Sequence, residues 1–374
     1  MARAPVLQTQ DEYPEADRLG QFPHPRKTAN LFGHEHGEAT LAKAFHTGRM
    51  HHAWLITGPQ GIGKATLAYR FAKYVLCRNE ERNGPEGSLD VDRESSGVSG
   101  VEALSHSGLL VIRRQWDIKS KRFPAQIRVD DVRRLRNFLS HRSGEGAWRV
   151  IIVDAADELN IAAANALLKS LEEPPTQTVF LLISSHAGRL LNTVRSRCRK
   201  LDLYPLKDEA LQKAGDQALV HQDEPVACVP CDALAKLIPI AEGRVHRLLS
   251  LAVSSGADMQ DEVWSLLNSL PKLDWGQAHK VSDKLAPVAS ADKFELFFDL
   301  LLDLIARVVR ARATGGGPQS EFDLASRVIK DGQLASWAAL WETVAAEKAE
   351  AMALNLDRKT LILSTLARLE TAAQ

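Results

Sequence analysis

The chain has 374 residues and a formal net charge of zero, from 47 Lys plus Arg and 47 Asp plus Glu. Hydrophobic residues make up 45% and charged residues 25%, which is typical of a globular protein with two or three domains. A neutral chain cannot attract nucleic acid by its overall charge, so such binding needs a local basic patch. No uncharged apolar stretch approaches 18 residues and the first residues do not resemble a signal peptide, so we predict a cytoplasmic protein without a membrane partner.

The first predicted elements surround a glycine-rich loop. Residues 1–25 are polar and contain several prolines, and we predict a flexible leader there. The apolar run 53–56 predicts a buried strand, and apolar residues at helical spacing over 65–77 predict a helix. Residues 57–66 (TGPQGIGKAT) lie between them, which is the strand-loop-helix context of a phosphate-binding loop.

This loop keeps the features that bind phosphate and lacks the hydroxyl that binds metal. Lys64 can reach the terminal phosphates of a nucleotide. The next position, where Ser or Thr would coordinate magnesium, is Ala65, and Thr66 is rotated by about 100° around the helix. We therefore predict that ATP or ADP can bind with weak metal dependence, and we leave open whether either binds; a glycine-rich turn without ligand is the alternative. The glycines that allow the tight turn are Gly58, Gly61 and Gly63.

The next segment carries no metal motif. Residues 79–107 are rich in Gly, Ser and acidic residues, and we predict a long surface loop. Of the four cysteines, only Cys77 lies near it, and since a structural zinc needs about four ligands, we predict no zinc and no other metal site. Cys228 and Cys231 have the spacing of half a metal or redox motif; without a second pair we interpret them as two loop thiols.

Basic residues then gather before the second clear strand. They suit contact with DNA phosphate or, equally, a solvated helix face plus loop. The apolar run 150–153 predicts a strand buried on both faces. Asp154 ends it at the sheet edge where ligands bind, and can position magnesium through water. The basic residues are Arg113, Arg114, Lys119, Lys121, Arg122, Arg128, Arg133, Arg134 and Arg136.

Beyond residue 206 the pattern is helical. Around residues 294–308 a broad apolar face predicts a long helix, which the run 315–318 (GGGP) ends. Helical patterns resume from 322 to 369. The residues of the apolar face are Phe294, Phe297, Phe298, Leu301, Leu304, Ile305 and Val308.

Three strings together resemble bacterial clamp-loader subunits of the AAA+ class. They are HHAWLITGPQGIGKATLA, VDAADELNIAAANALLKSLEEPP and the triplet Ser196-Arg197-Cys198. The resemblance is close over about 29–205. It implies an α/β P-loop (AAA+) domain with a parallel sheet at 26–206, a small helical lid domain at 207–265, and an all-helical collar domain at 266–374.

The resemblance also implies roles for single residues. Arg197 would be an arginine finger that enters the nucleotide site of a neighbouring subunit; a solvated basic loop is the alternative. Members of the class that hydrolyse ATP carry glutamate where this chain has Ala155. Together with Ala65, the alanine at this position predicts negligible ATP hydrolysis by the chain itself. The positions that would sense the γ-phosphate are Ser184 and Ser185. A second sensor position falls on His246, with Arg247 one residue late, and we predict no working second sensor.

The implied partners are an ATPase subunit and a delta-type subunit in a hetero-pentamer, with the sliding clamp and primed DNA reached through that complex. Two other functions stay open. The chain is an active clamp-loader ATPase if Thr66 and either Asp157 or Glu158 replace the missing groups. It is a nucleotide-independent scaffold if its basic residues bind the clamp or DNA directly.

Overall fold

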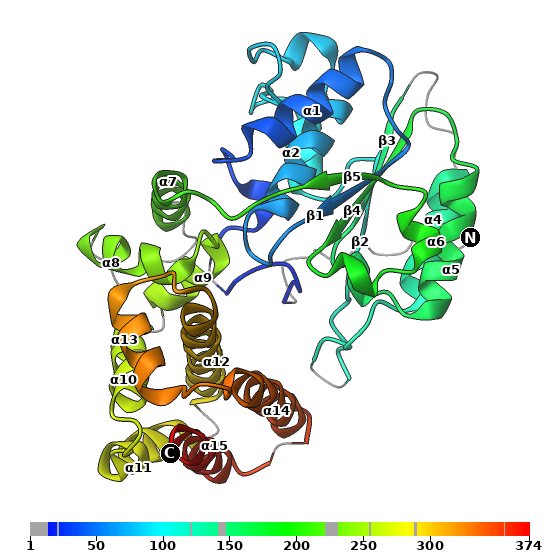
Figure 1. Cartoon of the computed structure of the whole chain (residues 1–374). Helices are drawn as coiled ribbons and strands as arrows, with labels where there is room; N and C mark the ends of the chain where they lie inside the picture. The colour runs from blue at the N-terminus through cyan, green and yellow to red at the C-terminus, as the bar shows by residue number, and fades with distance from the viewer. Residues whose placement is uncertain are drawn as a thin grey trace. The chain divides into compact units, whose positions relative to one another are not determined.

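The computed structural model describes residues 14–20, 22–119, 122–140, 147–220, 231–253, 256–287, 290–354 and 356–374. The chain divides into two compact units, Met1–Ser250 and Leu251–Gln374. The first contains all the described strands and the second is helical (Figure 1).

The first unit is built on a five-stranded parallel sheet in the order β2-β3-β4-β1-β5. The central strands are apolar along their whole length because both faces of the sheet are covered. This is the predicted α/β P-loop (AAA+) fold, and the strands expected at 53–56 and 150–153 are confirmed. The strands are β1 (Ala53–Thr57), β2 (Leu109–Ile112), β3 (Arg149–Val153), β4 (Thr178–Ser184) and β5 (Arg199–Asp202).

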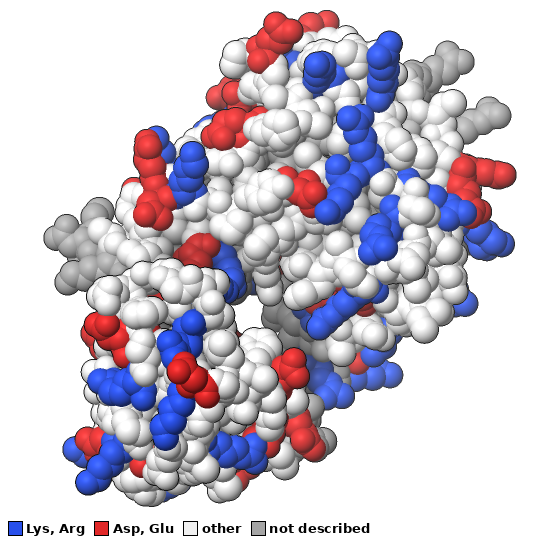
Figure 2. Space-filling model, in the orientation of Figure 1, with Lys and Arg blue, Asp and Glu red and all other residues white. Residues whose placement is uncertain are grey.

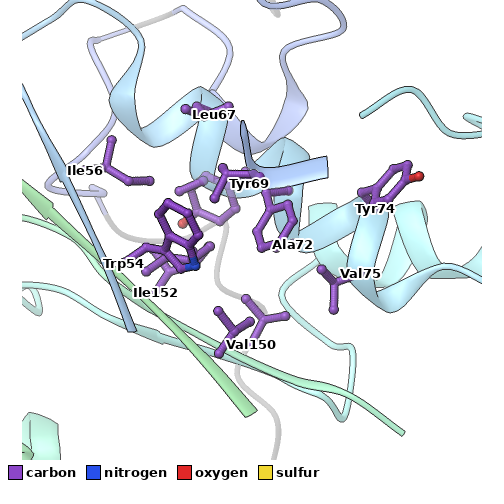
Figure 3. Packing of buried hydrophobic residues seen from close by; sticks show 14 of the residues in the cluster. Trp54, Ile56, Leu67, Tyr69, Ala72, Tyr74, Val75, Val150 and Ile152 are labelled. Carbon is purple, nitrogen blue, oxygen red and sulfur yellow. The ribbon is translucent and has the colours of Figure 1, made fainter. Parts of the chain in front are cut away.

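Helices cover the two faces of this sheet (Figure 1). Since side chains alternate along a strand, Trp54 and Ile56 pack toward one face and Leu55 toward the other. Figure 3 shows the first face, where Tyr69 and Ala72 lie against Trp54. Helices α1 (Glu35–His46) and α2 (Lys64–Leu76) belong to that face, and α4 (Val129–Ser140), α5 (Ile161–Glu172) and α6 (Asn192–Arg195) to the other.

Two segments expected at the surface bury part of their length. In the predicted leader 1–25, the described residues include Phe22 and His24, which are 3% and 1% exposed. In the predicted loop 79–107, apolar side chains at helical spacing are buried, and Val101 is fully inaccessible. The short elements here are η2 (Pro25–Lys27), η3 (Asn79–Glu81) and α3 (Ser96–Glu102).

Three more helices follow β5. Leu248 of α9 packs so closely on Gly215 of α7 that a Cβ at Gly215 would lie 2.8 Å from the Leu248 side chain. Glycine at this position therefore allows the two helices to approach. These helices are α7 (Asp208–Val220), α8 (Cys231–Ala241) and α9 (Val245–Val253). The domain bounds predicted at 206/207 and 265/266 stay predictions.

The second unit is all-helical. Its longest helix, α12, buries the predicted apolar face, with Phe294, Phe297 and Phe298 fully inaccessible. It ends at Gly315, whose φ of 68° suits glycine and stops the helix as expected. None of the helices in the described ranges is long and apolar enough to cross a bilayer. The helices are α10 (Gly256–Asn268), α11 (Trp275–Leu285), α12 (Ala291–Thr314), α13 (Gln319–Val328), α14 (Leu334–Leu354) and α15 (Arg358–Ala373).

Candidate functional site

The phosphate-binding loop connects the end of β1 to the start of α2, as predicted. Gly58, Gly61 and Gly63 all have positive φ, at 147°, 80° and 106°. A side chain at Gly61 would also collide with α9, because its Cβ would lie 2.5 Å from the Cβ of His246. The loop conformation therefore requires glycine, as expected where backbone must approach a phosphate closely.

Lys64 is held inside the loop. Its Nζ donates to the carbonyl oxygens of Gly58 and Pro59, at 2.8 and 2.6 Å, and to Oγ of Ser185 at 3.0 Å. Only 5% of the residue is exposed, and burial lowers the pKa of Lys64 to about 8, against the opposing charge of Asp154. The lysine is thus a buried cation next to the end of β4.

The sheet order brings the predicted residues together. Since β4 lies between β1 and β3, Ser185 follows β4 at a point between the loop and Asp154. The Asp157 carboxylate fixes this turn by accepting the backbone N–H groups of Ser185 and His186, both at 3.2 Å. Ser184 is fully buried, and its hydroxyl has no hydrogen-bond partner among the described residues. Of the two sensor candidates, Ser185 is therefore the one that reaches the site.

A cavity of about 380 Å³ lies over the loop within the first unit. Its lining brings together the loop residues 60–66, Asp154 and Ala155 after β3, Ser185 after β4, and His246 on α9. Its volume is typical of small-ligand sites, roughly 300–1,000 Å³. The lining also includes apolar side chains, namely Leu31, Phe32, Leu206, Val245 and Leu249.

The residues of this cavity fit a nucleotide better than they fit magnesium. Ala65 offers no oxygen ligand, and Thr66 lies on the same wall one position further along α2. Ala155, with φ of 56°, likewise offers no side-chain oxygen. Across the described residues, no group of three or more His, Cys, Asp or Glu side chains is arranged to hold a metal ion. The predicted thiol pair Cys228 and Cys231 lies outside the described side chains.

Arg197 lies apart from this cavity. Its Nη2 donates to Oε1 of Glu172 at 2.6 Å and its Nη1 to the carbonyl oxygen of Thr193 at 2.8 Å. The side chain is 36% exposed and is not among the residues that line the cavity. Next to it, the Cys198 thiol donates to the carbonyl oxygen of Val194 and packs against the core. The triplet thus places a partly exposed arginine beside a partly buried cysteine.

Sequence comparison relates this fold to replication proteins. Residues 33–207 match the family model described as DNA polymerase III, delta subunit. DNA polymerase III subunit tau of Escherichia coli is 32% identical over 257 residues, which are 68% of this chain and 37% of that protein. DNA polymerase III subunit delta' of Pseudomonas aeruginosa is 40% identical over 147 residues, 39% of this chain and 41% of that protein.

Residues 33–207 form a domain of the DNA polymerase III delta, gamma and tau clamp-loader family. The chain spans well under half of the length of these two relatives. A gamma subunit-related protein of Thermotoga maritima has a similar structure with a TM-score of 0.44, at 18% identity, covering 89% of this chain and 99% of that one.

The two residues considered for a second sensor, His246 and Arg247, lie differently with respect to the cavity. His246 lines the cavity, and its backbone N–H donates to the carbonyl oxygen of Gly61 at 3.1 Å. The Arg247 side chain lies 3.7 Å from the Glu242 carboxylate and does not line the cavity.

Sequence reasoning missed a buried charge network beside the clamp-loader site. Arg113, at the end of β2, pairs with Glu15 and Asp17, and His24 lies 2.9 Å from Asp17. Burial by itself would raise the pKa of Asp17, but the hydrogen bond from His24 and the charges of His24 and Arg113 lower it to about 2. Burial and the Asp17 charge together raise the pKa of Asp154 to about 7. No sequence motif links Glu15 and Asp17 to Arg113, because they are almost 100 residues apart.

One residue of the predicted basic patch belongs to this buried network, and others form ion pairs within the chain. Arg113 is buried, Arg114 pairs with Glu158 at 2.7 Å, and Arg133 pairs with Asp130 at 2.6 Å. Lys121 lies outside the described residues. On the face drawn in Figure 2, Lys and Arg side chains are interspersed with Asp and Glu. The exposed members of the patch that remain are Lys119, Arg122, Arg128, Arg134 and Arg136.

The buried Lys64 predicts a pH-dependent stability. Its folded pKa, about 8, lies below its ordinary value of 10.5, so holding the charge inside destabilises the fold below pH 8. This cost is removed as the pH rises from 8 to 10.5. We expect the effect of Lys64→Met on the free energy of unfolding to be more favourable at pH 7 than near pH 10, by on the order of 2 kcal/mol, since the loss of the three hydrogen bonds of Nζ applies at both values. Urea unfolding at both values measures this; an equal effect at the two values would contradict it.

Proposed function

We propose that the chain is a delta-prime-type subunit of a DNA polymerase III clamp loader, which completes the nucleotide site of a neighbouring ATPase subunit. The observation that carries the proposal is the position of Arg197, anchored by Glu172 at the surface and away from the cavity of its own chain. The DNA-stimulated ATPase rate of the assembled complex with Arg197→Ala tests it.

Arg197 suits this task chemically. A guanidinium is planar, permanently charged and matches phosphate oxygens with several N–H donors. Two N–H groups bind Glu172 and Thr193, and the others are available to a γ-phosphate brought by a neighbour. The phosphate charge would compete with Glu172 for the arginine, so the ion pair would hold the side chain in place until the neighbour docks.

The chain's own site would serve as a structural nucleotide site. Lys64 and the glycines of the loop would hold phosphates, while Ala65 and Ala155 supply neither a metal ligand nor a base. The implied partners are the ATPase subunit and a delta-type subunit in a hetero-pentamer, with the sliding clamp and primed DNA as its substrates. We place this complex in the cytoplasm.

Contacts in the site weigh against an active ATPase. Glu158, a candidate replacement base, is paired with Arg114 at 2.7 Å. Asp157, the other candidate, already accepts two backbone N–H groups. For a DNA-binding scaffold the basic patch is reduced, because Arg113 and Arg114 are paired within the chain, and it rests on the members that stay exposed.

The missing metal ligand gives a prediction for the purified chain. We expect equilibrium dialysis to give the same ADP affinity with and without magnesium, and we expect no ATP turnover above background. Ala65→Thr restores a hydroxyl beside Lys64 and is expected to introduce magnesium dependence without restoring turnover, since Ala155 still provides no base. Magnesium-dependent binding or turnover by the unaltered chain would contradict this.

A further inference from the structure

One polar side chain of the cavity lining, that of Gln217, binds the backbone of another lining residue. The Gln217 carboxamide, on α7, makes two hydrogen bonds to one residue of the linker before α1. Its Oε1 accepts the backbone N–H of Asn30 at 2.9 Å, and its Nε2 donates to the Asn30 carbonyl oxygen at 3.0 Å. Both residues line the cavity, next to Leu31 and Phe32.

The linker is held in place from its other side. Arg70, on α2, donates through Nη1 to the carbonyl oxygen of Ala29 at 2.9 Å. Arg70 is itself fixed by Glu38 and Asp90, each at 2.7 Å. The backbone of Asn30 therefore presents its N–H and C=O as a fixed donor and acceptor pair.

The chemistry of this pair matches a nucleobase. A carboxamide offers an acceptor and a donor side by side. Adenine offers the same combination through ring N1 and its N6 amino group. Guanine offers the reverse at these positions, since its O6 accepts and its N1–H donates. A backbone N–H and C=O of one residue can thus bind the N1/N6 edge of adenine and not the corresponding O6/N1 edge of guanine, and Gln217 satisfies them as adenine would.

We propose that the Gln217 carboxamide occupies the position at which a base would be recognised in this cavity, because it makes the two hydrogen bonds to Asn30 that adenine would make. Two small residues of the same helix, Ala214 and Ala218, also line the cavity. An entering adenine must displace Gln217 and gains no hydrogen bonds overall. The inference rests on the proposed nucleotide site and makes Gln217 a determinant of its affinity and base selectivity.

The test compares ADP and GDP binding, by calorimetry without magnesium, in the unaltered full-length chain and in Gln217→Leu. Removing the carboxamide frees two backbone groups, so ADP affinity is expected to rise about tenfold. GDP affinity should change little, because guanine presents the reversed pattern. The ratio of the two affinities is the deciding readout, since loosening α7 would alter both nucleotides alike.

Two further variants sharpen this test. Gln217→Ala repeats it with a different side chain should leucine disturb folding. Gln212→Leu is the matched control, because Gln212 lies on the same helix, bonds Asp216 at 2.9 Å and does not line the cavity. An equal gain for both nucleotides, no gain, a loss, or no binding by any variant would overturn the inference. None of these results affects the role of Arg197, which is measured in the neighbour's site.

Discussion

Replacing Arg197 with alanine is expected to lower ATP hydrolysis in the neighbouring clamp-loader site by about 10³-fold, the lower end for arginine fingers supplied in trans. The variant should still fold and assemble, because Arg197 is partly exposed and its ion pair with Glu172 is a surface one. The measurement is the DNA-stimulated ATPase rate of the reconstituted complex, together with clamp loading on primed DNA.

Two further variants test whether the effect is specific to the guanidinium of Arg197 or comes from any positive charge in this segment. Arg195→Ala removes an exposed arginine of the same segment, whose Nη2 donates to Oδ1 of Asn192 at 2.8 Å, and should leave the rate unchanged. Arg197→Lys keeps the charge and loses the planar fork, so most of the deficit should remain. Unchanged rates with Arg197→Ala would contradict the proposed function.

Replacing Arg113 with alanine is expected to destabilise the first unit by about 3 kcal/mol, because the buried Asp17 loses its arginine and keeps His24, while Glu15 keeps its ion pair with Arg26 at 2.8 Å. Chemical unfolding at pH 7 measures this. Arg133→Ala is the control, since the Arg133 and Asp130 side chains are 72% and 74% exposed and their pair should contribute well under about 1 kcal/mol.

The pH dependence of the Arg113 effect has a definite sign. In the unaltered chain the pKa of Asp17 is about 2, below its ordinary value of 3.8. Its ionised form therefore contributes stability that is fully present above about pH 4 and is lost as the pH falls toward 2. Without Arg113 the pKa of Asp17 rises and the variant loses less on acidification. The difference between the two proteins should narrow from pH 4 to 2; a constant difference would exclude Asp17 as the cause.

Local patterns were enough to find the sheet and the loop. The apolar runs at 53–56 and 150–153 are buried on both faces, so their composition alone marked them as strands. The spacing of glycines before Lys64 marked the loop, because few other structures require that order of residues. The segment 79–107 was harder, since its Gly and Ser content hid the buried residues Leu89 and Val101.

The candidate site was predictable only where its residues belong to known local motifs. Lys64, Asp154 and Ser185 each follow a strand, and parallel strands end at the same edge, so their meeting could be expected. The pairing of Gln217 with Asn30 could not, because it depends on how α7 packs almost 190 residues further along the chain.

By itself, the sequence determined the P-loop fold and the losses at Ala65 and Ala155, because these depend on residue type at fixed positions within short motifs. Tertiary structure alone decided which charges are buried, which basic residues are already paired, and which residues of the cavity lining bind one another. These are long-range contacts, and the free energy of a charge or a polar group is set by what surrounds it in space.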